Sequence, residues 1–244
     1  GKREGFHIFL IEANNVTISG FTIRNGGMSY LQELAGIRVI NSEDCTIEGN
    51  TFEDTTYGIY FEKSKKCSVL KNKFRGQAKD EASGGNGIHV WQGEEITIEG
   101  NDIRGHRDGV YFEFVKNALM RNNFVSHNIR YGLHFMSSND CRYFENTFSD
   151  NGAGVAVMYS RRIEMYRNSF LTNRGVASYG LLLKEIHDGK IQQNIFNLNT
   201  VGIFMEGSNR NLFRYNKFQS NGTAIRVMGD CEDNNFTENN LLFN

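Results

Sequence analysis

The sequence predicts an all-β fold, a single-stranded right-handed parallel β-helix of about ten coils. Three observations support this prediction. Two short motifs recur along the chain, the runs between them alternate apolar and polar residues, and proline is absent while 26 of the 244 residues are glycine. Alternation with a period of two is typical of strands. Proline lacks the backbone N–H that strand pairing uses, so a chain of paired strands is expected to avoid it.

The first motif is an Asn-x-Phe triplet, or a close variant, that recurs every 21 to 29 residues and most often every 22. The triplets begin at Asn50, Asn72, Asn101, Asn122, Asn146, Asn168, Asn194, Asn216 and Asn239. Stacked amides form hydrogen-bonded ladders, and stacked Phe rings can fill a core behind them. We therefore expect the Asn column to be structural.

The second motif is a glycine followed by an aliphatic residue, which precedes the Asn by 14 residues in seven of nine coils. It begins at Gly36, Gly58, Gly87, Gly109, Gly132, Gly154, Gly180 and Gly202, with Ala224 in the last coil. Such a coil is too short for a βαβ unit of about 30 residues or more. We expect residues 1–244 to form one β-helix domain, about 48 Å long at about 4.8 Å per coil, and to be an excised part of a longer chain.

Counted from the glycine, positions +1 and +3 are apolar and should fill the core, so positions +2 and +4 should face outward. The +2 column then reads Phe9, Arg38, Tyr60, His89, Tyr111, His134, Ala156, Leu182, Phe204 and Arg226. The +4 column reads Ile11, Ile40, Glu62, Trp91, Glu113, Met136, Met158, Lys184, Glu206 and Met228. An aromatic and Met-rich outer face marks an interaction or ligand site. We expect His89, Trp91, Tyr111, Glu113 and Lys184 to contribute to it.

The strongest candidate site on this face combines one imidazole with two thioethers. His134 and Met136 lie two residues apart on one strand, at about 6.6–6.8 Å between Cα atoms, and Met158 lies one coil away, at about 4.8 Å from Met136. Imidazole and thioether ligands suit Cu(I) and suit Zn²⁺ or Mg²⁺ poorly. Methionine is also common in promiscuous protein interfaces. From these residues alone a transient Cu(I) site, a protein-docking surface and burial under a loop all remain open.

A second, weaker metal candidate is the pair His106 and His127, each five residues after its Asn. In the other coils this slot holds Asn151, Asn173, Asn199 and Asn221. Two adjacent histidines can form a pH-sensitive or metal-binding pair. A structural role, in which they replace the turn hydrogen bond of the asparagine, is the favoured interpretation.

Composition excludes several classes of protein. With 27 Lys+Arg against 28 Asp+Glu, the chain lacks the basic excess that a nucleic-acid-binding protein usually shows. The sequence contains no run of about 18 apolar residues, the length that a membrane-spanning helix needs. The four cysteines lack C-x-x-C spacing, and we expect Cys45 and Cys67 to be small core residues.

Four stretches in successive coils resemble the NosD family of periplasmic β-helix proteins. They are Arg107-Asp108-Gly109-Val110-Tyr111, Tyr131-Gly132-Leu133-His134-Phe135-Met136, Val155-Ala156-Val157-Met158-Tyr159-Ser160-Arg161, and Asn173-Arg174-Gly175 followed by Tyr179-Gly180-Leu181-Leu182-Leu183-Lys184. They occur in the family's order over roughly residues 106–184. This resemblance is more specific than the Asn and Gly repeat, which other β-helices share.

The resemblance implies a non-enzymatic accessory protein in the periplasm. NosD-like proteins work with the permease and ATPase of an ABC transporter, a copper chaperone and apo nitrous oxide reductase, whose copper centres they help to assemble during denitrification. The resemblance therefore favours transient binding of Cu(I) by His134, Met136 and Met158. The chain shows no leader and starts within a coil, so the resemblance assigns none of its residues to the segments that dock the transporter.

Two other functions remain open at this point. A polysaccharide lyase, hydrolase or epimerase would need carboxylates and bases on the outer face. Asp108 and Glu113, however, would lie about 16 Å apart in an extended strand, too far for a paired acid and base at about 5–9.5 Å. The third possibility is a metal-free scaffold that binds partners beside the long corners at Gly26–Ala35 and Gln77–Asn86.

Overall fold

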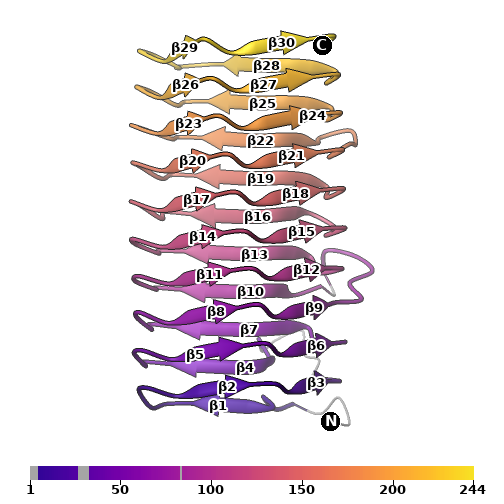
Figure 1. Cartoon of the computed structure of the whole chain (residues 1–244), viewed down its shortest axis with the longest axis vertical. Helices are drawn as coiled ribbons and strands as arrows, with labels where there is room; N and C mark the ends of the chain where they lie inside the picture. The colour runs from indigo at the N-terminus through magenta and orange to yellow at the C-terminus, as the bar shows by residue number, and fades with distance from the viewer. Residues whose placement is uncertain (1–4, 27–32, 83) are drawn as a thin grey trace.

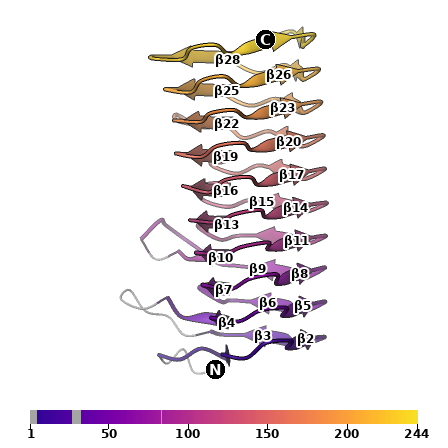
Figure 2. The same cartoon turned by 90° about the vertical axis from the view of Figure 1, so that its left-hand side faces the viewer.

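The computed structural model describes residues 5–26, 33–82 and 84–244. Every secondary-structure element in this part of the chain is a strand. The strands form three parallel sheets, here called sheets A, B and C, each with ten strands stacked in chain order. Each strand pairs with its counterpart one coil later, so the fold is a right-handed parallel β-solenoid with one end of the chain at each end of the stack (Figures 1 and 2). The predicted fold class is confirmed.

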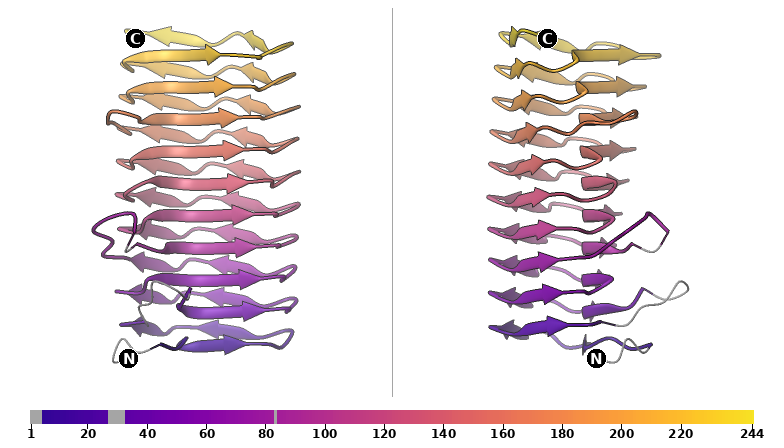
Figure 3. Two further views of the ribbon diagram at one scale, coloured as in Figure 1. Left: turned by 180° about the vertical axis from the view of Figure 1, so that it is seen from behind. Right: turned by 90° about the vertical axis from the view of Figure 1, so that its right-hand side faces the viewer.

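Sheet A contains the longest strands and faces the viewer in the left view of Figure 3. Its strands are β1 (Phe9–Ile11), β4 (Ala35–Ile40), β7 (Tyr57–Glu62), β10 (Asn86–Trp91), β13 (Asp108–Glu113), β16 (Tyr131–Met136), β19 (Ala153–Met158), β22 (Tyr179–Lys184), β25 (Val201–Glu206) and β28 (Thr223–Met228).

Sheets B and C consist of strands of three residues. Sheet B contains β2 (Thr17–Ser19), β5 (Thr46–Glu48), β8 (Ser68–Leu70), β11 (Thr97–Glu99), β14 (Leu119–Arg121), β17 (Arg142–Phe144), β20 (Glu164–Tyr166), β23 (Lys190–Gln192), β26 (Leu212–Arg214) and β29 (Asn235–Thr237). Sheet C contains β3 (Thr22–Arg24), β6 (Thr51–Glu53), β9 (Lys73–Arg75), β12 (Asp102–Arg104), β15 (Phe124–Ser126), β18 (Thr147–Ser149), β21 (Ser169–Leu171), β24 (Ile195–Asn197), β27 (Lys217–Gln219) and β30 (Asn240–Leu242).

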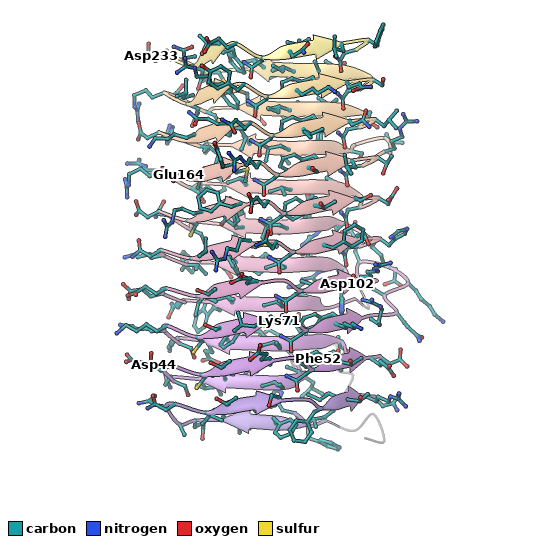
Figure 4. The ribbon with its side chains drawn as sticks, in the orientation of Figure 1. Asp44, Phe52, Lys71, Asp102, Glu164 and Asp233 are labelled. Atoms are coloured by element: carbon teal, nitrogen blue, oxygen red, sulfur yellow. The ribbon has the colours of Figure 1, made fainter. Side chains whose placement is uncertain are left out.

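The interior is built from aliphatic side chains, stacked Phe rings and amide ladders. Phe52 stacks on Phe74 with ring centroids 4.6 Å apart, and Phe52 lies inside the stack while Asp44 lies at an outer corner (Figure 4). In the Asn ladder, each amide Oδ1 accepts bonds from the backbone N–H and Nδ2 of the preceding coil, as Asn146 does from Asn123 at 3.1 and 2.9 Å. These bonds satisfy buried polar groups that would otherwise be costly. The structural role predicted for the Asn column is confirmed.

The glycine at the second position of the long strands β4 to β25 of sheet A is required by close packing between coils. A Cβ on Gly132 would lie 2.6 Å from the carbonyl oxygen of Gly154 and 3.0 Å from the ring of Phe148. Real Cβ atoms do not approach backbone oxygens so closely, so any side chain here must push two coils apart. This constraint explains the recurring Gly motif.

Two predicted registers are wrong by one residue. In the first coil Leu10, not Phe9, aligns with Arg38, and Ile11 pairs with Val39 and is buried rather than outward. The short strand β1 holds no glycine that would have fixed its register.

In the fifth coil the ladder residue is Asn123, not Asn122, because Asn101 donates to the Oδ1 of Asn123. Two successive asparagines made the triplet ambiguous. With Asn123, the interval from Gly109 becomes the usual 14 residues.

The four cysteines are free thiols, and Cys45 and Cys67 are buried, as predicted. The chain between β9 and β10 projects beside the stack (Figures 2 and 3). Residues 27–32 of the first predicted long corner and residue 83 of the second lie outside the described residues. In the described ranges there is no helix with the length and apolar character needed to cross a bilayer.

Candidate functional site

The outer face of sheet A carries the two predicted columns from β4 onward. In the +2 column, His89 pairs with Tyr111, Tyr111 with His134, and His134 with Ala156. In the +4 column the strand partners run in the order Trp91, Glu113, Met136, Met158, Lys184. The register therefore brings the predicted outer-face residues together on one wall.

The strict alternation of side chains breaks at the glycine. The missing Cβ of Gly132 points to the interior groups Phe148 and Asn151, and the next residue, Leu133, is also buried. Two successive positions thus face inward, and the residue before the glycine turns to the outer face. Its ring in this coil, Tyr131, lies with its centroid 4.9 Å from that of His134.

One of these extra outward residues, Tyr57, lines a groove with a volume of about 610 Å³ on the N-terminal half of sheet A. The groove is lined by Glu33, Arg38, Tyr57, Tyr60, Glu62, His89, Trp91, Arg107, Tyr111, Glu113, Arg130 and His134. A volume of several hundred Å³ with a few convergent polar groups is typical of a small-ligand site.

A buried ion-pair cluster closes the floor of the groove at the start of the strands. Asp108 is fully buried, and Arg130 binds it with two hydrogen bonds, Nε to Oδ1 at 2.9 Å and Nη2 to Oδ2 at 2.5 Å. The Nε of Arg107 lies 3.6 Å from Oδ2 of the same carboxylate. Burial raises the pKa of Asp108, but its pairing with His134 and Arg130 outweighs burial and holds that pKa below its usual value. Asp108 is therefore a fixed anion.

His89 is held as a neutral hydrogen-bond donor. Its ring stacks on Tyr60 at 4.2 Å, and burial, with the positive charge of Arg107, lowers its pKa to about 3. Arg107 Nη2 donates to Asn86 Oδ1 at 3.2 Å, so the Asn86 Nδ2 donates to His89 Nδ1 at 3.0 Å. A neutral imidazole that accepts at Nδ1 carries its proton at Nε2. His89 thus presents an N–H and no lone pair.

His134, two coils further along the same column, differs from His89. Its Nδ1 faces the cluster, 3.5 Å from Arg130 Nη2 and 3.9 Å from Asp108 Oδ2. Its Nε2 is buried and has no hydrogen-bond partner in the described part of the chain. An unpartnered buried nitrogen is unfavourable, and Nε2 is the ring atom left for an additional ligand.

Met136 and Met158 end the neighbouring strands β16 and β19, are paired in register and are half-buried. On one side of this pair lies Glu113, and on the other Lys184, whose Nζ is 3.4 Å from the Glu206 carboxylate. Among the described residues, no group of three or more His, Cys, Asp or Glu could hold a metal ion. A metal site on this wall would therefore depend on thioethers.

The second predicted histidine pair does not form as expected. His106 occupies the second Asn ladder, where its backbone N–H donates to Asn128 Oδ1 at 3.0 Å, so Asn128 is its equivalent in the next coil. His127 lies one residue earlier, at an exposed corner with a φ of 55°. The equivalence of the two histidines is wrong, because it followed from the one-residue error at Asn122. His106 takes a place in the ladder through its backbone N–H, and its side chain is buried with Nε2 lacking a hydrogen-bond partner among the described residues.

Sequence reasoning missed Tyr57, Asn86, Tyr131 and Arg130 as parts of the outer face. A strict period of two assigns the residue before the glycine to the interior, whereas the break in alternation turns it outward. The available signal was chemical, because that slot holds polar or aromatic residues in four successive coils, which a closed aliphatic core does not accommodate.

The fold and this wall together define a parallel β-helix protein with an aromatic, Met-containing outer face on sheet A. Residues 74–244 match the family described as "Periplasmic copper-binding protein (NosD)", and residues 2–103 match "Right handed beta helix region". The chain belongs to the NosD family. The resemblance predicted from the four sequence stretches is confirmed.

A curated relative from Pseudomonas aeruginosa, the "Probable ABC transporter binding protein NosD", is 25% identical over 104 residues. The match spans 42% of this chain and 24% of the relative, so it reaches only about a quarter of that protein's length.

Solved structures with the same fold include carbohydrate-active proteins. The periplasmic alginate epimerase AlgG has a TM-score of 0.77 and 15% identity, over 95% of this chain and 62% of its own. A tailspike protein of E. coli bacteriophage HK620 in complex with a pentasaccharide has a TM-score of 0.62 and 13% identity, over 88% of this chain and 45% of its own. At these identities the likeness shows the fold alone.

Proposed function

We propose that this protein is a periplasmic accessory protein that receives or relays Cu(I) at His134, Met136 and Met158 for the copper centres of nitrous oxide reductase. The observation that carries the proposal is the in-register pair of Met136 and Met158 beside an imidazole whose Nε2 is buried without a partner. The family's description as periplasmic and copper-binding supports it.

The chemistry of the three side chains suits a transferable cargo. Thioether sulfur and imidazole nitrogen prefer Cu(I) over the harder divalent ions. All three ligands are neutral, so the ion keeps its charge when bound, and no proton must leave a thiol or carboxylic acid. Methionine has flexible torsions, so the sulfurs can move onto and off an ion without disturbing the strand backbone.

The partners in this proposal are the permease and ATPase of an ABC transporter, a copper chaperone and the apo-reductase. The name of the Pseudomonas aeruginosa relative, an ABC transporter binding protein, supports the first of them. The Met pair lies at the C-terminal ends of its strands, next to the exposed corner residue Tyr159, where a partner can approach without opening the solenoid.

We propose a binding rather than a catalytic role. The acid that a glycan-cleaving β-helix enzyme would need is not available from Asp108, which is fully buried and doubly bonded to Arg130. Glu113 lies at the opposite end of the same strand. Incubation with uronate polymers should therefore give no absorbance from an unsaturated product, and a rise that depends on His134 would assign an enzyme instead.

The test of copper binding is a Cu(I) competition titration against a chromophoric chelator. We expect one Cu(I) per chain, with affinity reduced about tenfold or more by His134→Ala or by Met136→Leu with Met158→Leu, the scale of loss when a metal site is perturbed. Met228→Leu and His127→Ala are matched controls, because Met228 lies in the same column beside Glu206 and His127 is at an exposed corner. Unchanged affinity in both test variants would remove the site.

A further inference from the structure

The groove at the N-terminal half of sheet A has no role in the copper proposal except that His134 borders it. It extends across β4, β7, β10, β13 and β16, whereas Met136 and Met158 are absent from its lining. Two of its guanidinium nitrogens, Arg38 Nε and Arg107 Nε, are buried without a hydrogen-bond partner in the described chain. Buried N–H groups without acceptors are unfavourable, so these atoms indicate a ligand that supplies oxygen.

The polar groups are arranged unevenly across the groove. At the starts of the strands, Arg107 and Arg130 share one carboxylate, that of Asp108, so these two guanidinium groups outnumber the acid between them. Glu33 also lines the groove, beside Tyr60. At the ends of the strands, Glu113 and Glu62 offer carboxylate oxygens, with Trp91 between them in the column and one oxygen of Glu62 bonded to Arg38. A fitting ligand therefore has an anionic group on one side and hydrogen-bond donors on the other.

The rings between these two sides leave their polar edges for the ligand. Tyr60, His89 and Tyr111 are piled along the solenoid axis, with centroid separations of 4.2 and 4.7 Å. Tyr60 and His89 stack face to face while Tyr111 is tilted by 45° against His89, and His89 contributes an Nε2–H donor, as derived above from its bond to Asn86. Edges that donate and accept hydrogen bonds suit hydroxyl groups better than an apolar side chain.

The groove lies on the face of a sheet, and this position disfavours a peptide as its ligand. The backbone N–H and C=O groups of these strands are engaged in pairing between coils, so they cannot bind an added strand as an open sheet edge does. The coil spacing of about 4.8 Å is close to the length of a pyranose unit in an extended chain, so successive sugars can face successive coils.

From these features we infer that the groove is a binding site for an acidic oligosaccharide, with the uronate carboxylate at Arg107 and Arg130 and the ring hydroxyls toward Glu62 and Glu113. Arg107 is the residue to test, and because its Nη2 also holds Asn86, the comparison of a charged with an uncharged sugar separates charge recognition from this structural role. Its removal leaves both bonds between Arg130 and Asp108 in place, and its side chain is 24% exposed.

The experiment is calorimetric titration of the whole 244-residue chain with a tetra-uronate, compared with the same tetrasaccharide after reduction of its carboxyl groups to alcohols. We expect saturable binding of the uronate, binding of the reduced sugar weaker by about tenfold or more, and a similar loss in Arg107→Ala, as for a lost charge-assisted hydrogen bond. Arg107→Lys should recover part of the affinity because it restores the charge.

The control variant is Arg121→Ala, which removes an arginine from an Arg–Glu pair on sheet B, away from the groove. It should leave uronate binding unchanged, and so should Met136→Leu with Met158→Leu, so that failure of the copper site and failure of the groove are separable. No binding of either sugar, equal binding of both, or full affinity in Arg107→Ala would each overturn the assignment.

Discussion

The inner and outer faces of sheet A belong to the same strands but follow different rules. Facing inward, Val110, Leu133 and Val155 are aliphatic and fully buried in successive coils. On the outer face the corresponding residues are Tyr111, His134 and Ala156.

An inward residue meets the same neighbours in each coil, so packing selects one chemistry and repeats it. An outward residue is free of that constraint, and burying polar groups such as His89 and His134 there costs free energy. The comparison teaches that repeated packing does not account for the irregular outer face, which is why we propose a binding role for it.

The largest expected effect is at the inner face. Gly132→Ala places a Cβ within 2.6 Å of the Gly154 carbonyl oxygen, so we expect the free energy of unfolding to fall by about 2–4 kcal/mol, as for an overpacked core. Thermal unfolding followed by circular dichroism measures the change. Gly26→Ala is the matched control, because its Cβ would meet Thr55 at an ordinary 3.4 Å. Equal stability of the two variants would contradict the packing argument.

An intermediate effect on stability is expected at His106, an ionisable residue that is buried in the interior. It is fully buried, its Nε2 has no hydrogen-bond partner among the described residues, and burial lowers its pKa to about 4. Unfolded histidine has a pKa of about 6.5. As the pH falls from about 6.5 to 4, the unfolded chain binds a proton that the folded chain does not, so stability decreases by up to about 3 kcal/mol.

His106→Asn should remove that loss, because Asn is the residue of this ladder in the coils that follow. We expect parent and variant to unfold at similar temperatures at pH 7.5, and the variant to be more stable at pH 4.5. His127→Asn, at an exposed corner, should behave as the parent. If His106→Asn retained the parent's acid sensitivity, burial of the imidazole would not be its cause.

The smallest effect on stability is expected from the outer face. Met136→Leu with Met158→Leu keeps apolar side chains of similar volume at two half-buried positions, so unfolding should change by less than about 1.5 kcal/mol. The same double variant should lose Cu(I) affinity. A large loss of stability would mean that the two methionines serve packing, and the contrast between the faces would disappear.

Much of the fold could be predicted from the sequence because each coil repeats the same local demands. The glycine that clears the next coil's carbonyl and the asparagine that bonds the next amide occur at nearly fixed spacing, and together they define strands, corners and stacking. Register failed only where these markers were missing or doubled, at β1, which lacks the glycine, and at Asn122 and Asn123.

The candidate site could be predicted only in part. The columns with His134, Met136 and Met158 follow from alternation, but the groove depends on the break in alternation at the glycine. Its ion-pair floor joins Arg130 to Asp108 of the preceding coil, and the different surroundings of His89 and His134 depend on Asn86 and Asp108. Apart from Asn86 and His89, which share β10, these side-chain partners come from different coils, where no spacing rule applies.

The most direct test of the central claim is anomalous diffraction at the copper edge from crystals of the protein loaded with Cu(I). The account predicts one strong peak on the outer face of sheet A, within bonding distance of the Met136 and Met158 sulfurs and the Nε2 of His134. A peak bound elsewhere, for instance at His127, or no peak on this wall in copper-loaded protein would contradict it.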